Sequence, residues 1–156
     1  MQLSPSFLYK HIRLFALLSI VVTSMSFTGK PGDSVVIIVN LKNPIGNLTV
    51  AQAKDIYLRK ESKRWKALNS NIIPLDTRGD SDTKNMFLAK VLQMSKIEMY
   101  RYFSSREYQN QEQPPVRVSS EDDIIKFVQE NSGAIGYVMS SVADGKPNIK
   151  VICTVE

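Results

Sequence analysis

One short turn of the chain combines a cation, two hydroxyls and several backbone N–H groups: Arg78, Ser81, Asp82 and Thr83. The turn follows the apolar run 72–75 and precedes a helical apolar pattern over 86–92. A helix that begins at such a turn directs its first N–H groups and the positive end of its dipole at one point. That point can hold an oxyanion, and the Arg78 guanidinium could add a bidentate contact to phosphate or sulfate.

A purely structural interpretation of this turn is also open. Asp80 or Ser81 could cap the helix by accepting a hydrogen bond from a nearby backbone N–H, and that role needs no ligand. Asp76, Asp80 and Asp82 also bring negative charge to the turn. Like charges oppose anion binding unless one acid carries a proton or accepts one from the ligand. Local chemistry therefore leaves both interpretations open.

The first 26 residues have the pattern of a cleaved export signal. A basic segment with Lys10 and Arg13 precedes the apolar run 14–22, and small residues at 24–26 offer a cleavage site. The apolar run is shorter than the roughly 20 residues of a membrane span, although an uncleaved anchor is the alternative. We therefore predict a signal peptide over 1–26 and one periplasmic domain over 27–156.

The composition argues against most catalytic sites. The chain contains one histidine, His11, and one cysteine, Cys153. Because His11 would leave with the signal peptide, the mature domain lacks a Ser-His-Asp triad, a Cys-His pair and a Cys/His zinc site. We expect no catalytic residue, no metal and no cofactor. The net charge is +5, of which Lys10 and Arg13 supply two units, so the mature domain is only mildly basic, which says little about its partners. Because the chain has an export pattern, we expect no nucleic-acid partner.

Strands and helices alternate along the mature chain. Four apolar or β-branched runs predict strands: 35–39, 72–75, 134–138 and 149–155. Capping residues ahead of apolar stripes predict helix starts: Thr49, Ser95 and the pair Ser119-Ser120. This alternation predicts an α/β domain with a mostly parallel sheet flanked by helices. Ligands of such sheets bind beyond the carboxyl ends of the strands, so Asn40 and Asn43 are predicted to line the site.

Four motifs follow one another along the mature chain. Leu48-Thr49 opens a helix that ends at Ile56-Tyr57, Trp65 follows, the turn with Arg78 and Ser81-Asp82-Thr83 comes next, and Gly133-Ala-Ile-Gly-Tyr137 comes last. In this order they resemble the periplasmic phosphate-binding proteins of ABC phosphate importers. The turn resembles the Arg and Ser-Gly-Thr phosphate loop of that family, and the last motif matches its late Gly-Ala-Ile-Gly-Tyr signature. The resemblance spans about residues 35 to 139.

The resemblance implies a type II periplasmic-binding-protein-like fold and only one of its two lobes, the lobe with the Arg and Ser-Gly-Thr loop. By position, Arg78, Ser81, Asp82 and Thr83 would bind phosphate. Asp82 stands where the family has glycine, so it brings a charge to the anion and could accept a proton from hydrogen phosphate. A single lobe leaves the anion half solvated. A membrane transporter, a receptor or a second copy of the chain would supply the missing wall.

We therefore expect an exported solute-binding domain, not an enzyme, that binds phosphate or a related oxyanion and serves an ABC importer or a sensor. The alternative is a periplasmic protein-interaction module that keeps the fold and has lost anion binding through Asp82. A hydrolase that works through carboxylates or a metal is a second rival, disfavoured by the missing histidine.

Overall fold

The computed structural model describes residues 32–60, 63–110 and 112–155. The predicted signal peptide lies outside these residues. In the described part of the chain, no helix has both the length and the apolar character needed to cross a membrane.

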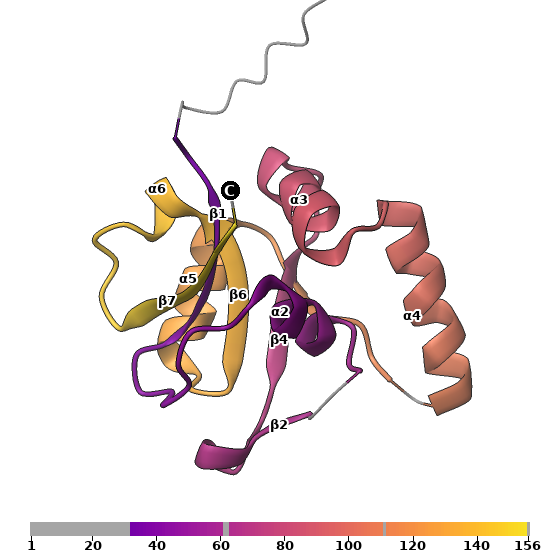
Figure 1. The fold of residues 1–156 in the computed structure, drawn as a ribbon, viewed down its shortest axis with the longest axis horizontal. Helices are drawn as coiled ribbons and strands as arrows, with labels where there is room; N and C mark the ends of the chain where they lie inside the picture. Colours follow the sequence, from indigo (N-terminus) through magenta and orange to yellow (C-terminus); the bar gives the residue numbers. More distant parts are fainter. Residues whose placement is uncertain (1–31, 61–62, 111, 156) are drawn as a thin grey trace, which may run out of the picture.

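A five-stranded sheet in the order β5-β4-β6-β1-β7 forms the centre of the domain (Figure 1). Its strands are β1 (Val35–Asn40), β4 (Ile73–Thr77), β5 (Val116–Val118), β6 (Ala134–Met139) and β7 (Ile149–Val155). β4 pairs in parallel with β5 and β6, whereas β1 is antiparallel to both β6 and β7. All strands except β1 therefore point the same way, which confirms the predicted α/β class with a mostly parallel sheet.

Helices cover both faces of this sheet. They are α2 (Val50–Tyr57), α3 (Asp82–Phe87) with its π-helical continuation η3 (Leu88–Leu92), α4 (Lys96–Asn110), α5 (Glu121–Glu130) and α6 (Ser140–Ala143). A small hairpin is formed by β2 (Arg64–Trp65), the 3-10 turn η2 (Lys66–Leu68) and β3 (Ser70–Asn71). One core cluster joins the sheet to α2, α3, η3 and α4, and a second joins it to α5 and α6.

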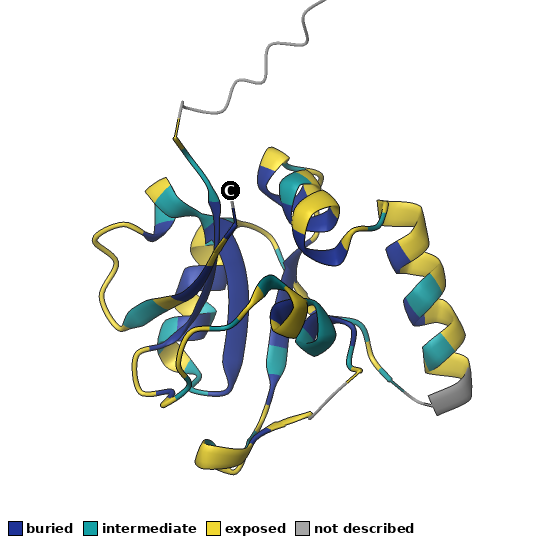
Figure 2. Ribbon diagram, viewed as in Figure 1, coloured by how far each residue is buried: buried dark blue, intermediate teal, exposed yellow. Residues whose placement is uncertain are grey.

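β1 is buried on both faces, as its continuous β-branched sequence predicts. Val35, Ile37 and Val39 pack in the cluster with α2 and α3, while Val36 and Ile38 pack in the cluster with α5. Figure 2 shows β1 and β6 as the buried centre of the molecule. The pleat of one central strand therefore supplies side chains to both layers.

Two glycines of the late signature allow close packing against β6. A Cβ on Gly136 would lie 2.2 Å from Cγ2 of Ile124, so only glycine lets α5 approach the sheet this closely. A Cβ on Gly133 would lie 2.4 Å from the carbonyl oxygen of Asn71. The Gly133 carbonyl accepts a 2.9 Å hydrogen bond from Trp65 Nε1. Two of the motifs recognised in the sequence therefore contact one another.

The predicted helix starts are confirmed. Thr49 and Gln52 form the reciprocal capping box of α2. Ser95 and Glu98 exchange equivalent bonds ahead of α4, and Ser120 caps α5. Because β4, β5 and β6 are parallel and are followed by α3, α5 and α6, these three helices begin at the same end of the sheet. We call it the carboxyl end of the sheet, and the opposite one the amino end.

Candidate functional site

The turn at the carboxyl end joins β4, which ends at Thr77, to α3, which begins at Asp82. Ser81 caps α3, and its Oγ accepts a 3.1 Å hydrogen bond from the backbone N–H of Lys84. The structural interpretation is therefore correct for the Ser81 oxygen. The N–H groups of Asp82 and Thr83, the first two of the helix, have no acceptor among the described residues. Two backbone donors remain available for an anion.

Arg78 lies exposed at the end of β4. Its backbone N–H donates to the Val118 carbonyl at 2.9 Å, which fixes the start of the turn against β5. Its Nε lies 3.4 Å from the Arg117 carbonyl, and its two terminal nitrogens bond to no described residue. The guanidinium fork is thus oriented by β5 and free to bind a ligand.

Thr83, a predicted phosphate ligand, has its hydroxyl bound within the chain. Its side chain is buried, and its Oγ1 donates to one carboxylate oxygen of Glu121, at the start of α5. The other oxygen of Glu121 accepts a 2.7 Å hydrogen bond from the backbone N–H of Met139. An anion would reach the Thr83 hydroxyl only by displacing Glu121. The Thr83 backbone N–H is the group that remains accessible to an anion.

A buried polar network supports the turn from below. Asp76 and Lys84 are 2% and 4% exposed, and Lys84 Nζ lies 2.8 Å from Asp76 Oδ2. Lys84 also donates to the Thr77 carbonyl at 2.6 Å. The Tyr137 hydroxyl donates to Asp76 Oδ1 at 2.6 Å. This network ties α3 to β4 and β6, so the turn has a fixed base.

Tyr137 is held in this network as a neutral donor. Its ring stacks on Phe87 with ring centroids 3.9 Å apart. Burial raises the pKa of Tyr137, and the neighbouring Asp76 carboxylate raises it further. The phenol therefore keeps its proton at neutral pH and continues to donate to Asp76.

The three acids around the turn differ in how their charge is compensated. The Asp76 carboxylate is paired with Lys84. Asp80 Oδ1 lies 2.6 Å from Lys96 Nζ, and this hydrogen bond holds the pKa of Asp80 below its usual value. Asp82 is exposed and has no cationic partner within the described residues. Of these three acids, only Asp82 therefore presents uncompensated negative charge to an incoming anion.

A cleft of about 530 Å³ opens beside the turn, between α4 and the segment that leads into β5. Its basic lining residues are Arg78, Lys84, Lys96 and Arg117. Its apolar lining residues are Ile97, Met99, Tyr100, Phe103, Pro114 and Pro115. Asp76 and Glu107 complete the charged lining. The cleft thus combines cations next to the turn with an apolar wall along α4.

The prediction that Asn40 and Asn43 line the same site is wrong. β1 runs against β4, β5 and β6, so the residues after β1 lie at the amino end of the sheet. The Asn40 amide donates at 2.8 Å to the carbonyls of both Val128 and Gln129. The Asn43 amide donates to the Ser132 carbonyl at 3.1 Å. Both amides hold the end of α5 and the residues after it, and both are buried.

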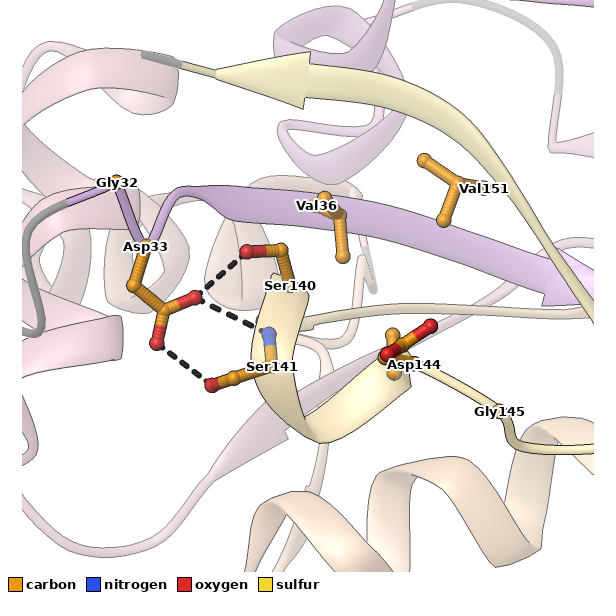
Figure 3. A pocket seen from close by; sticks show the side chains of 9 residues that line it. Gly32, Asp33, Val36, Ser140, Ser141, Asp144, Gly145 and Val151 are labelled. Atoms are coloured by element: carbon orange, nitrogen blue, oxygen red, sulfur yellow. Dashed lines mark hydrogen bonds between the residues drawn. The ribbon is translucent and has the colours of Figure 1, made fainter.

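A second hollow at the carboxyl end, of about 510 Å³, lies where Asp33 meets the start of α6 (Figure 3). Asp33 accepts hydrogen bonds from the Ser140 hydroxyl at 2.6 Å, the Ser141 N–H at 3.1 Å and the Ser141 hydroxyl at 2.6 Å. These donors hold the pKa of Asp33 below its usual value. A carboxylate of the chain thus already binds the donors at the start of α6.

The residues that sequence patterns did not identify are Lys84, Tyr137, Glu121 and Arg117. Lys84 follows the turn by one helical position and resembles an ordinary solvated lysine in the sequence. Glu121 lies in an acidic first helical turn, where such residues are ordinary helix stabilisers. The one available signal was the order of elements, since parallel strands bring the starts of their following helices together.

Comparisons with known proteins agree with this fold. The model of a PBP superfamily domain matches residues 32–150. An ABC-type phosphate transport receptor from Vibrio cholerae superimposes with a TM-score of 0.57 at 21% identity, over 77% of this chain and 45% of that chain. PstS from Borrelia burgdorferi gives a TM-score of 0.57 at 16% identity, over 77% and 46%. A putative phosphate ABC transporter substrate-binding protein from Clostridium perfringens, with bound phosphate, gives a TM-score of 0.56 at 21% identity, over 79% of this chain and 55% of that chain.

The chain therefore spans about half the length of the solved structures that it matches. At these identities the likeness establishes the shared fold, and it confirms the predicted periplasmic-binding-protein-like architecture. No curated protein matches the chain.

Proposed function

This chain belongs to the family of PBP superfamily domains, and on that basis we propose that it is a solute-binding domain for phosphate or a related oxyanion. The observation that carries the proposal is the turn after β4. There the two terminal nitrogens of the exposed Arg78 guanidinium and the N–H groups of Asp82 and Thr83 have no partner among the described residues. Convergent donors and a cation are what a tetrahedral oxyanion requires.

Each residue of the turn has a distinct role in this proposal. Arg78 supplies charge-assisted hydrogen bonds. Ser81 keeps the helix start in place by accepting from the Lys84 N–H, which leaves its own hydroxyl proton available to donate to the anion. Thr83 contributes its backbone N–H, because its hydroxyl is bound to Glu121.

Asp82 determines which oxyanion is preferred. Its carboxylate is uncompensated, so it repels a fully ionised anion such as sulfate. Hydrogen phosphate carries a proton that Asp82 can accept, which converts the repulsion into a hydrogen bond. We therefore propose a preference for phosphate over sulfate.

The exposure of the turn limits the affinity. Arg78, Gly79 and Asp80 are exposed, so water and salt screen a bound anion. We expect a dissociation constant that is micromolar at best, about −8 kcal/mol or less favourable. Tighter binding requires a second wall, from a membrane transporter, a receptor or a second copy of the chain.

The setting that we propose is the periplasm, in the service of an ABC importer or a sensor. The support is the export pattern of residues 1–26 together with the structural neighbours, one of which is an ABC-type phosphate transport receptor. The chain corresponds to less than half of that receptor, so a transport role would need further components.

A protein-interaction module without anion binding is the second candidate. The bond between the Thr83 hydroxyl and Glu121 and the uncompensated charge of Asp82 both favour it. Phosphate affinity separates the two candidates.

The test is calorimetric titration of the protein, purified after expression of the full chain, with phosphate and, as a control, sulfate. We expect saturable heat with phosphate, lost in Arg78→Ala and retained in Arg101→Ala, which removes an exposed arginine of α4 outside the cleft. Absence of phosphate binding in the unmodified protein would overturn the proposal in favour of the interaction module.

A further inference from the structure

The cleft beside the turn is larger than inorganic phosphate requires. A tetrahedral oxyanion displaces a few water molecules, each of about 30 Å³, whereas the cleft measures about 530 Å³. Volumes of this size are typical of sites for small organic ligands, which combine an apolar wall with a few polar groups. The extra space therefore needs an occupant with an apolar part.

The cations of the cleft gather where β4 and β5 end. Lys84 is paired with Asp76, and Lys96 with Asp80. Arg78 and Arg117 are the two guanidinium groups of the lining, and Arg78 Nε points to the Arg117 carbonyl. Arg117 Nε lies 4.0 Å from Asp76 Oδ2, whereas Lys84 Nζ lies 2.8 Å from the same oxygen. Arg117 is therefore held less tightly by this carboxylate than Lys84 is. Two guanidinium groups that line one cleft favour a phosphoryl group.

The apolar wall of the cleft lies on α4. Tyr100 and Ile97 are 68% and 62% exposed, and both line the cleft together with the buried Phe103. Their spacing places them on one face of the helix. The wall starts one residue after Lys96, so it is continuous with the cationic part of the cleft. An aromatic ring on the ligand would stack on Tyr100 and cover apolar surface that is otherwise solvated.

We infer that the ligand is a phosphomonoester with an aromatic or compact apolar substituent. Its phosphoryl group lies between Arg78 and Arg117, and its substituent lies against Tyr100 and Phe103. This inference rests on the proposed function, because it takes phosphate binding at Arg78 as its starting point. It adds a ligand class and two residues, Arg117 and Tyr100, that the turn alone does not assign.

The test compares phenyl phosphate, inorganic phosphate and phenol on the purified protein by calorimetry. We expect phenyl phosphate to bind at least tenfold more tightly than inorganic phosphate, and phenol not to bind. Tyr100→Ala should remove that advantage without changing the affinity for inorganic phosphate. Arg117→Ala should weaken both phosphoryl ligands. The matched control is Tyr108→Ala, since Tyr108 is 93% exposed on α4 and lies outside the cleft.

The outcomes separate this inference from the proposed function. Equal affinity for phenyl phosphate and inorganic phosphate would overturn the inference and leave the proposed function intact. An advantage that survives Tyr100→Ala, or phenol binding as tightly as phenyl phosphate, would also overturn it. Binding of neither phosphoryl ligand would overturn both.

Discussion

Asn40 ends β1 and Arg78 follows β4, so these two polar residues lie at opposite ends of the same sheet. Asn40 is buried, its amide donates two hydrogen bonds, and its oxygen accepts a third from the Lys42 N–H. Arg78 is exposed and makes one long side-chain hydrogen bond. A buried side chain whose hydrogen bonds are all made within the chain is structural, whereas an oriented cation with spare donors is suited to a ligand.

The carboxyl end itself contains the same contrast. The donors at the start of α6 are bound by Asp33, and the Thr83 hydroxyl is bound by Glu121. The first N–H groups of α3 have no such internal acid among the described residues. Where the chain supplies its own carboxylate, an external anion has nothing to add. At the turn after β4 the N–H groups of Asp82 and Thr83 stay open to a ligand, and they lie in the same turn as the oriented Arg78 cation.

The largest loss of stability that we expect comes from removing the buried ion pair of Asp76 and Lys84 beneath the turn. Lys84→Met leaves the Asp76 carboxylate buried without its partner, which should lower the free energy of unfolding by about 3–5 kcal/mol. The double variant Asp76→Asn/Lys84→Met should recover part of this loss, since it removes both charges. Urea denaturation gives the free energy of unfolding of the unmodified protein, Lys84→Met and the double variant. Equal stability of Lys84→Met and the unmodified protein would show that the pair does not hold the turn.

The second largest loss of stability should come from a substitution at the amino end of the sheet. Asn40→Ala leaves the Val128 and Gln129 carbonyls without their donor, and we expect a loss of about 2–3 kcal/mol. Phosphate affinity should stay unchanged, because β1 ends away from the turn. Asn47→Ala, at an exposed loop position, is the control and should be neutral. A change in phosphate affinity in Asn40→Ala would contradict the separation of the two ends.

Local sequence signals predicted four strands of the sheet and the starts of α2, α4 and α5, for physical reasons that act over a few residues; they did not predict β5, the hairpin of β2 and β3, or α6. The β-branched run of β1 and the reciprocal bonds of Thr49 and Gln52 depend only on near neighbours. The direction of β1 does not. It depends on pairing with β6 and β7, more than ninety residues away along the chain. The sequence-based prediction placed Asn40 and Asn43 at the site because it took β1 to run in the same direction as the other strands of the sheet. β1 runs in the opposite direction, so both residues lie at the other end of the sheet.

The candidate site was predictable only in part. Arg78 and Ser81 belong to one turn, so sequence spacing brings them together. The partners Tyr137 of Asp76 and Glu121 of Thr83 come from distant elements. Asp76 and Lys84 are eight positions apart, and their pairing depends on how α3 folds back over β4. Spacing alone could not show which acids are compensated.

A pH effect of intermediate size tests the buried phenol at the carboxyl end. Burial and the Asp76 carboxylate raise the pKa of Tyr137, while an unfolded tyrosine loses its proton near pH 10. Above about pH 10 the unfolded state therefore binds fewer protons than the folded state. The free energy of unfolding should then fall as pH rises, by about 1.4 kcal/mol per pH unit for each such tyrosine.

The measurement is urea denaturation from about pH 9 to about pH 11. Tyr57 is also buried with a raised pKa, so some decline remains in Tyr137→Phe, but it should be shallower than in the unmodified protein. Tyr108→Phe changes an exposed tyrosine and should leave the decline as it is. An unchanged decline in Tyr137→Phe would mean that this phenol titrates normally.

The smallest effect on stability, and the sharpest on selectivity, should come from Asp82→Asn. An acid in the first turn of a helix contributes about 0.3–1 kcal/mol, so the loss of stability should stay in that range. A unit charge about 6 Å from another in water contributes about 0.7 kcal/mol. Removing the Asp82 charge should therefore strengthen sulfate binding several-fold, whereas phosphate, which donates its proton to this side chain, should change little.

The matched control for Asp82→Asn is Asp122→Asn, in the first turn of α5. It should cost a similar small amount of stability and leave both anions unaffected, because the start of α5 is not the turn after β4. If Asp82→Asn strengthens phosphate and sulfate binding equally, then Asp82 acts only as a repelling charge and accepts no proton. If Asp82→Asn changes the affinity for neither anion, then the anion does not lie at the start of α3. The exposed donors of the turn after β4 would then not be a phosphate site, and the difference between the two ends of the sheet would have no connection with ligand binding.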